Sequence, residues 1–197
     1  MTLSNENQRD MAALDADNLL SSEYEYIAQS AFQANEDRAR VSTYYVVTFG
    51  TLVAALFSLQ IDNDALGNLH RALVVVFLTL SLFGLSTLLQ LVRLRQAWIE
   101  SIRALNQIKE FYLGQLPQIG LAEALRWRTN TIPAPYKPWS IAFLLALQVA
   151  LLGGVSLGAT VYFLGLVLAN PTWALPIFVG LTYTLLQIWL YKYLLRN

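Results

Sequence analysis

The sequence predicts an all-α integral membrane protein with four transmembrane helices, arranged as two hairpins with helical cytoplasmic extensions. Three observations lead to this fold class. Of the 197 residues, 56% are hydrophobic and only 13% are charged, whereas about a quarter of an average soluble domain is charged. The apolar residues gather in tracts that are long enough to cross a bilayer. The basic residues lie almost entirely on one side of those tracts.

The first hairpin is predicted from two tracts that contain no charged residue. Residues 41–61 and residues 72–92 each provide 21 positions without Asp, Glu, Lys or Arg, and about 20 apolar residues cross a hydrocarbon core of ~30 Å. The second tract holds fourteen Leu, Val and Phe residues. Their favourable insertion outweighs the few hydroxyls and Gln90.

The second hairpin occupies residues 140–197. Its apolar tract runs from Pro138 to Tyr191 without a charged residue, and a single helix of that length would be about twice too long for a bilayer. The tract must therefore fold back. Asn170-Pro171-Thr172 predicts the turn, because proline interrupts the helical hydrogen bonds, so we expect spans at residues 142–168 and 173–192.

The distribution of Lys and Arg predicts the orientation. With the amino terminus in the cytoplasm, the inner segments hold twelve basic residues and the outer loops hold only Arg71. Because short cytoplasmic loops carry an excess of positive charge, we expect both termini on the cytoplasmic side of a cell (plasma or inner) membrane. The basic residues at the inner interface are expected to anchor anionic lipid headgroups; they are Arg38, Arg40, Arg93 and Lys192.

Two cytoplasmic helices are expected beside the first hairpin. After a polar, acidic tail at residues 1–21, the pattern Ser22-x-x-Glu25 predicts a helix start. This entry helix continues to residue 40, and the exit helix covers residues 93–113 and ends near Gly114. Each has an apolar stripe at helical spacing, which comprises Leu20, Tyr24, Ile27, Ala31 and Ala34 in the first and Leu94, Trp98, Ile102, Leu105, Ile108 and Tyr112 in the second.

The acidic entry helix and the basic exit helix are expected to pack antiparallel to each other. Both apolar stripes need cover, and the burial of Tyr24, Ile27, Trp98 and Ile102 should contribute most. Exposed ion pairs would add only ~0.2 to 1 kcal/mol each. The following linker, residues 114–139, contains a short helical piece, LAEALRWR, and then the proline-rich segment TIPAPYKPW, which suits an extended return to the membrane.

Residues 22–113 resemble a known family. Their entry helix and first span (EYEYIAQSAFQANEDRARVSTYYVV) and their long exit helix (RLRQAWIESIRALNQIKEFYL) resemble the SLATT family of prokaryotic membrane effectors. The resemblance implies a hairpin that oligomerises and perforates or perturbs the membrane when a sensor partner detects infection, and it implies no enzymatic residues. The second hairpin, residues 140–197, is a departure from that family.

Small residues form two ridges within the predicted spans, and such ridges allow helices to approach closely. The ridge residues are Gly50, Ala54 and Ser58 in the first span and Gly154 and Gly158 in the third. They serve either an oligomer interface or packing within one subunit. Three glutamines in the spans, Gln90, Gln148 and Gln187, either make interhelical hydrogen bonds, the simpler interpretation, or line a polar path.

The sequence offers no catalytic or metal-binding pattern. It contains no cysteine and a single histidine, His70, and it lacks a phosphate loop, a Gly-x-Ser-x-Gly elbow, a His-Glu-x-x-His pair and a dinucleotide fingerprint. We therefore expect no enzymatic activity, no cofactor and no metal. The net charge of zero argues against binding to nucleic acid.

Three functions remain as hypotheses. The leading one is a non-catalytic homo-oligomer in the lipid bilayer that acts as a membrane-permeabilising effector and responds to a cytosolic sensor protein. The rival is a membrane scaffold or regulatory subunit that recruits a cytosolic partner, with contacts expected at Arg95, Trp98 and Arg103. A coupled transporter is the third, and it is disfavoured because the spans hold no ionisable group at mid-membrane.

The orientation gives the first testable prediction. Reporter tags at residue 1, within residues 115–135 and at residue 197 should be cytoplasmic, and tags after Asn63 and Asn170 should be external, because of the twelve-to-one distribution of basic residues. Accessibility of each tag to a membrane-impermeant reagent measures this. An external carboxyl terminus would remove one span and contradict the four-helix topology.

Overall fold

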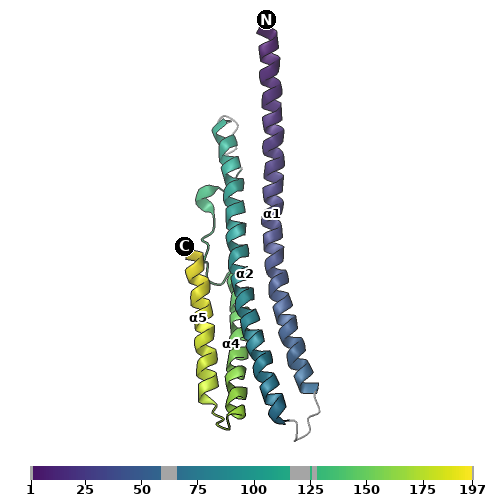
Figure 1. Ribbon diagram of the computed structural model, residues 1–197. Helices are drawn as coiled ribbons and strands as arrows, with labels where there is room; N and C mark the ends of the chain where they lie inside the picture. Colours follow the sequence, from purple (N-terminus) through teal and green to yellow (C-terminus); the bar gives the residue numbers. More distant parts are fainter. Residues whose placement is uncertain (1, 59–65, 116–124, 126–127, 197) are drawn as a thin grey trace. The chain divides into compact units, whose positions relative to one another are not determined.

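The computed structural model describes residues 2–58, 66–115, 125 and 128–196, and the regular structure in these ranges is helical (Figure 1). Its elements are α1 (Thr2–Ser58), α2 (Leu66–Gln115), the short 3-10 helix η3 (Thr129–Thr131), α4 (Ile141–Val167) and α5 (Ala174–Arg196). Each of the four long helices contains a segment long and apolar enough to cross a membrane; in α1 this segment lies within Asp17–Leu56. The prediction of an all-helical chain with four helices able to span a membrane is therefore confirmed.

The helix boundaries differ from the expected ones by a few residues. Helix α5 continues to Arg196, four residues beyond the expected end at residue 192, and α2 includes Gly114, which was expected to cap it. The end of the first expected span, residues 59–61, lies outside the described residues, as does most of the expected helix LAEALRWR at residues 121–128.

Local interactions explain where the second hairpin begins and turns. The hydroxyl of Ser140 accepts a hydrogen bond from the backbone N–H of Phe143 (3.3 Å), which caps the start of α4. At the other end Ala169 adopts a left-handed conformation, with φ of 54°, and the N–H of Asn170 donates to the carbonyl of Gly165 (2.9 Å). Pro171 follows and cannot continue the ladder, so the turn lies where the Asn-Pro-Thr sequence predicts it.

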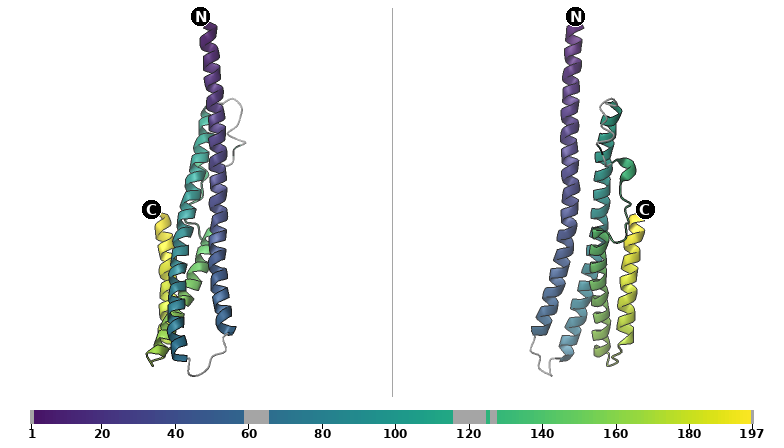
Figure 2. Two further views of the ribbon diagram at one scale, coloured as in Figure 1. Left: turned by 45° about the vertical axis from the view of Figure 1, so that its right-hand side comes forward. Right: turned by 180° about the vertical axis from the view of Figure 1, so that it is seen from behind.

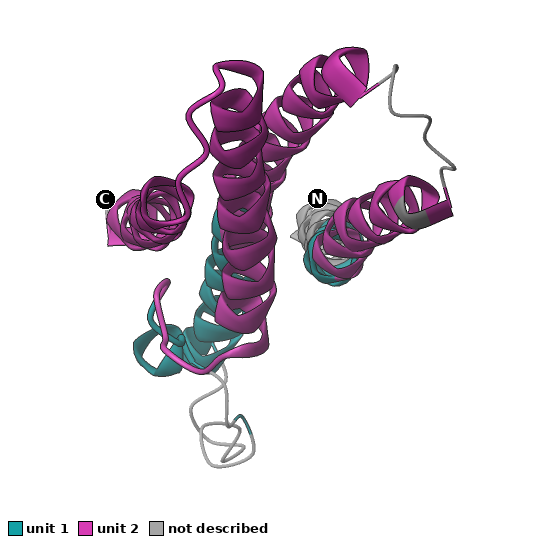
Figure 3. Cartoon of the chain, turned by 90° about the horizontal axis from the view of Figure 1, so that it is seen from below, with its two compact units in different colours: residues 1–35, 96–134 teal, residues 36–95, 135–197 magenta. Residues whose placement is uncertain are grey.

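The chain divides into two compact units (Figure 3). Unit 1 comprises Met1–Asn35 and Gln96–Ala134, and unit 2 comprises Glu36–Arg95 and Pro135–Asn197. Helices α1 and α2 each contribute to both units, whereas α4 and α5 belong to unit 2 alone. The charge-free tracts of all four helices therefore belong to unit 2.

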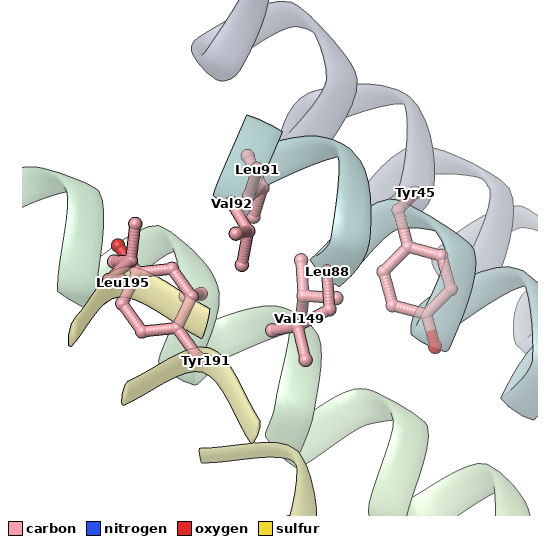
Figure 4. Packing of buried hydrophobic residues seen from close by; sticks show 8 residues of the cluster. Tyr45, Leu88, Leu91, Val92, Val149, Tyr191 and Leu195 are labelled. Carbon is pink, nitrogen blue, oxygen red and sulfur yellow. The ribbon is translucent and has the colours of Figure 1, made fainter. Parts of the chain in front are cut away.

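The core of unit 2 consists of two apolar clusters. In the first, shown in Figure 4, residues of α1, α2, α4 and α5 pack together: Tyr45, Leu88, Leu91, Val92, Ala146, Val149, Tyr191 and Leu195. The second cluster centres on Leu73, Phe77 and Leu80 of α2, with the ring of Phe163 stacked on Phe77 at 5.7 Å. Helices α4 and α5 lie side by side in Figure 1 and in the right-hand view of Figure 2.

In unit 1 the entry and exit segments of α1 and α2 contact each other. The hydroxyl of Tyr112 donates to the carboxylate of Asp17 (3.4 Å), and the Lys109 ammonium lies 6.0 Å from the centre of the Tyr24 ring. Asp17 precedes Tyr24 in α1, whereas its partner Tyr112 follows Lys109 in α2. The two segments are therefore antiparallel, as the complementary stripes predicted.

The residues buried at this seam are not all those expected. Tyr24 is 37% exposed and Trp98 and Ile102 are half-buried, whereas Ile99 and Leu105 are buried. Only two long helices are described in this unit, and they cannot cover a large ring on every side. The burial expected of Tyr24, Trp98 and Ile102 is therefore incomplete.

The seam can be tested by cross-linking, because the natural chain has no thiol. Cysteines at Asp17 and Tyr112, which face each other, should be joined by a short bifunctional maleimide. Cysteines at Asp15 and Tyr112 should not, because two residues turn a helix by about 200°. The measurement is the shift of the monomer band on a denaturing gel, and equal cross-linking of both pairs would contradict the antiparallel seam.

Candidate functional site

The ridge in α4 lies against α5 of the same chain. A side-chain carbon on Gly154 would lie 2.7 Å from the carbonyl oxygen of Gly180 and would collide with the hydroxyl of Thr184. One on Gly158 would lie 3.0 Å from the carbonyl oxygen of Pro176. The backbones of α4 and α5 therefore approach closely along this ridge, and the interhelical hydrogen bond from the Thr184 hydroxyl to the carbonyl of Ala150 (3.3 Å) adds to the contact.

The ridge in α1 has a different environment. Gly50, Ala54 and Ser58 are all exposed, and a side-chain carbon on Gly50 would meet nothing within 4 Å. The hydroxyl of Ser58 bonds back to the carbonyl of Ala55 in its own helix (2.8 Å). Of the two predicted ridges, one thus packs within the chain and the other is left uncovered by the described residues.

Four helices of unit 2 meet at two glycines that sequence reasoning did not single out. A side-chain carbon on Gly84 would lie 2.5 Å from the Tyr45 hydroxyl oxygen and 3.4 Å from Cα of Gly153. One on Gly153 would lie 2.8 Å from Nε2 of Gln187. The two glycines therefore provide the space that two large polar side chains, one from α1 and one from α5, occupy.

The polar groups at this crossing differ in their hydrogen bonding. The buried Tyr45 hydroxyl donates to the carbonyl of Leu80 (3.3 Å). Gln187 is 1% exposed, and neither of its side-chain amide atoms has a hydrogen-bond partner among the described residues. The predicted interhelical hydrogen bond is therefore wrong for Gln187, although Thr184, one turn earlier, does make one.

The four expected headgroup anchors have different surroundings. Arg40 is exposed and pairs with Glu36 (3.2 Å) and Asp37 (3.7 Å) on its own helix. Arg93 is exposed too, and the exposed Lys192 places its ammonium 5.7 Å from the centre of the Tyr136 ring. Arg38, in contrast, is only 6% exposed. Its expected place at the surface is wrong, because it lies on the buried face of α1.

The three expected partner contacts do not form one surface. Arg95 is 6% exposed and its Nε donates to the carbonyl of Pro135 (3.2 Å), so it is an interior residue of unit 2 and not an exposed contact. Trp98 and Arg103 belong to unit 1, where Trp98 is half-buried and Arg103 is exposed. Only Arg103 is freely presented to a partner.

Another contact of unit 1 involves a carboxylate. The backbone N–H of Thr129 in η3 donates to Oε1 of Glu110 in α2 (3.1 Å). Hydrogen bonding by Thr129, through its side chain and its backbone, holds the pKa of Glu110 below its ordinary value. This contact ties η3 to the exit helix.

Within the described part of the chain, no three His, Cys, Asp or Glu residues come together as metal ligands would. His70 lies beside the ring of Phe163 (6.2 Å between ring centres), an interaction that needs no ligand.

A comparison of this chain with protein-family models, curated proteins and solved structures finds no match. The class of protein therefore rests on the chain's own features: it is an all-helical protein with four helices able to span a membrane.

The two ridges give a matched pair of substitutions. Gly154→Ala should lower the melting temperature of the purified protein, because its new methyl group meets the backbone of Gly180 and such overpacking costs about 1 to 3 kcal/mol. Gly50→Ala, which meets nothing, should be neutral or stabilise the helix by up to ~1 kcal/mol. Equal melting temperatures would contradict the close α4–α5 contact.

Proposed function

We propose that the protein is an integral membrane protein of the cell membrane, with four spans and both termini in the cytoplasm, that acts without catalysis. It assembles into a homo-oligomer and changes the permeability of the membrane, and its cytoplasmic helices receive the signal from a sensor partner. This function agrees with the resemblance of residues 22–113 to the SLATT membrane effectors.

The single observation that best supports self-assembly is the exposure of α1. Only 11% of its most apolar window is buried, against 39% in α2 and in α4 and 28% in α5. Beside the exposed Tyr44 and Val47, the uncovered face presents small and hydroxyl-bearing residues: Thr43, Thr48, Gly50, Thr51, Ala54 and Ser58. Such residues are enriched where helices pack together in membranes.

The space beside this face is open as well. An apolar groove runs between α1 and α4 in unit 2, and its lining includes Gly50, Leu144 and Leu151. A helix from a second copy can approach α1 closely here, since Gly50 has no side chain to hold it off. The α4 ridge at Gly154 and Gly158 is less suitable for contact with a second copy, because it already packs against α5.

A specific observation also favours the scaffold function. Unit 1 exposes large apolar side chains, with Leu19, Tyr26 and Phe32 each at least 67% exposed and Phe111 51% exposed. Aromatic residues are enriched in protein interfaces, so these side chains provide a surface for a cytosolic partner. This surface is suited to binding the sensor protein to which an effector responds, and equally to binding a cytosolic partner that a scaffold recruits.

The proposal predicts self-association and depolarisation together. Overproduction should depolarise the membrane, measured with a potential-sensitive dye, and a cysteine at Ala54 should cross-link two copies under oxidation. The double substitution of Gly50 and Ala54 by leucine should abolish the depolarisation at unchanged abundance, because the bulky side chains prevent close approach.

The matched control is Leu181, an exposed residue of α5. A cysteine there should not cross-link, and Leu181→Ala should depolarise like the wild type. A normal membrane potential at high abundance of the wild type, while Ala54→Cys still cross-links, would contradict permeabilisation and favour the scaffold function. Absence of the cross-link would contradict self-assembly through α1.

A further inference from the structure

The groove between α1 and α4 contains a polar side chain. Its lining in unit 2 includes Val46 and Gly50 of α1 and Leu147 and Gln148 of α4. Among the described residues that line this groove, only Gln148 has hydrogen-bonding groups in its side chain. That amide is exposed, and it lies seven residues, or about 10 Å, along α4 from the start of the helix at Ile141.

An exposed amide within a membrane span is costly for a single chain. Lipid hydrocarbon neither donates nor accepts hydrogen bonds, so an amide in contact with it loses the hydrogen bonds that it makes in water. Membrane helices satisfy such groups by hydrogen bonding to a neighbouring helix. The environment of Gln148 therefore favours a polar group that is supplied from outside the chain.

Another exposed glutamine of unit 2 has different surroundings. Gln90 of α2 lies three residues before Arg93, and the groove beside it includes the charged residues Asp37 and Arg93. Charged residues at the end of a span belong to the membrane surface, where water reaches a neighbouring amide. Gln90 therefore needs no partner helix, and it provides a matched control for Gln148.

The exposed face of α1 offers a complementary group. Thr51 is exposed, and it lies about 100° from Gly50 and about 60° from Ala54 around the helix. Its hydroxyl oxygen accepts hydrogen bonds, and a glutamine amide donates them. Copies of one protein share their orientation in a membrane, so rotation about the membrane normal keeps every residue at its depth. Thr51 of a second copy therefore lies near the level of Gly50, which lines the same groove as Gln148.

We propose that α1 of a second copy docks against the groove between α1 and α4, where Gln148 donates a hydrogen bond to the hydroxyl of its Thr51. The inference rests on the proposed self-assembly through α1, and it names the surface and the polar contact that receive the second copy. In a two-fold symmetric dimer the bond forms twice, once from each copy. Gly50 permits the close approach, and Gln148 selects the register, because a displaced partner helix would leave the amide in lipid.

The test is a double-mutant cycle on the association of the full chain in lipid vesicles. Energy transfer between copies labelled at an added terminal cysteine measures association over a range of protein-to-lipid ratios. Gln148→Met and Thr51→Val, which keep the side-chain size, should each weaken association roughly three- to fifteen-fold, as expected for one hydrogen bond between membrane helices. The double variant should be no weaker than the weaker single variant, because both substitutions remove the same bond. Gln90→Met should associate like the wild type.

Cysteine variants give a second measurement, because the natural chain has no thiol. A mixture of Gln148→Cys protein and size-tagged Thr51→Cys protein should form a mixed disulfide-linked dimer under oxidation. Gln90→Cys in place of Gln148→Cys should not form one. A membrane-impermeant thiol reagent should leave Gln148→Cys unmodified, because the groove is filled by a helix of the second copy and not by water.

The outcomes separate this inference from the proposed self-assembly. Wild-type association of the Gln148→Met protein, while Ala54→Cys still cross-links, would overturn the hydrogen bond and leave self-assembly through α1 standing. Additive effects of Gln148→Met and Thr51→Val would overturn it too, because the two residues would then act separately. Rapid modification of Gln148→Cys would assign the amide to a water-filled path instead. Absence of the Ala54→Cys cross-link would overturn both proposals.

Discussion

The close approach of α4 and α5 is the contact on which the rest of unit 2 depends. Apolar side chains gain little by leaving lipid for a protein interior, so helices in a membrane are held by close packing and hydrogen bonds. Gly154 and Gly180 supply that closeness, and Thr184 supplies a hydrogen bond across it. A side chain at either glycine would force the two helices apart.

The position of α5 determines in turn what its inner end can contact. Tyr191 and Leu195 join the cluster around Leu88 and Val149 because α5 is held against α4. A disturbance at Gly154 in α4 would displace its contact Thr184 in α5. Thr184 lies two turns before Tyr191 in the same helix, so the disturbance would reach the cluster.

The helices were predictable because each depends on local sequence. Charge-free tracts of bilayer length and a single proline-containing turn define the spans without knowledge of their neighbours. The ridges were visible too, as small residues at helical spacing. Their partners were not, because Gly154 and Gly50 have the same chemistry, and only the fold places the first against Gly180 and leaves the second uncovered.

The inward position of Arg38 had a signal in the sequence that charge obscured. The apolar stripe of the entry helix reaches Ala31 and Ala34, and its 3-4 spacing continues through Arg38, Ser42 and Tyr45, all of which are buried. Periodicity alone places Arg38 on the buried face, and Arg40, about 200° around the helix, on the exposed one. Both residues are basic, but only Arg40 lies at the surface.

The meeting of Gly84 with Gly153 had no comparable signal. A glycine within an apolar helix is compatible with several packings, and the sequence does not indicate which large side chain will fill the space it leaves. Here Tyr45 occupies the space at Gly84 and Gln187 the space at Gly153. Such pairings arise from contacts between distant segments, which a local pattern cannot specify.

The two faces of α1 have different surroundings. Its buried face carries Arg38 and Tyr45, and its exposed face carries Gly50 and Ala54. The hydroxyl of Tyr45 donates to the carbonyl of Leu80 and links α1 to α2, although α1 is the helix whose apolar window is least buried. Because the exposed ridge belongs to the same rigid helix, contacts that fix the buried face also fix the direction of that ridge. The packing of unit 2 would then favour one geometry of the proposed self-assembly without touching the assembling surface.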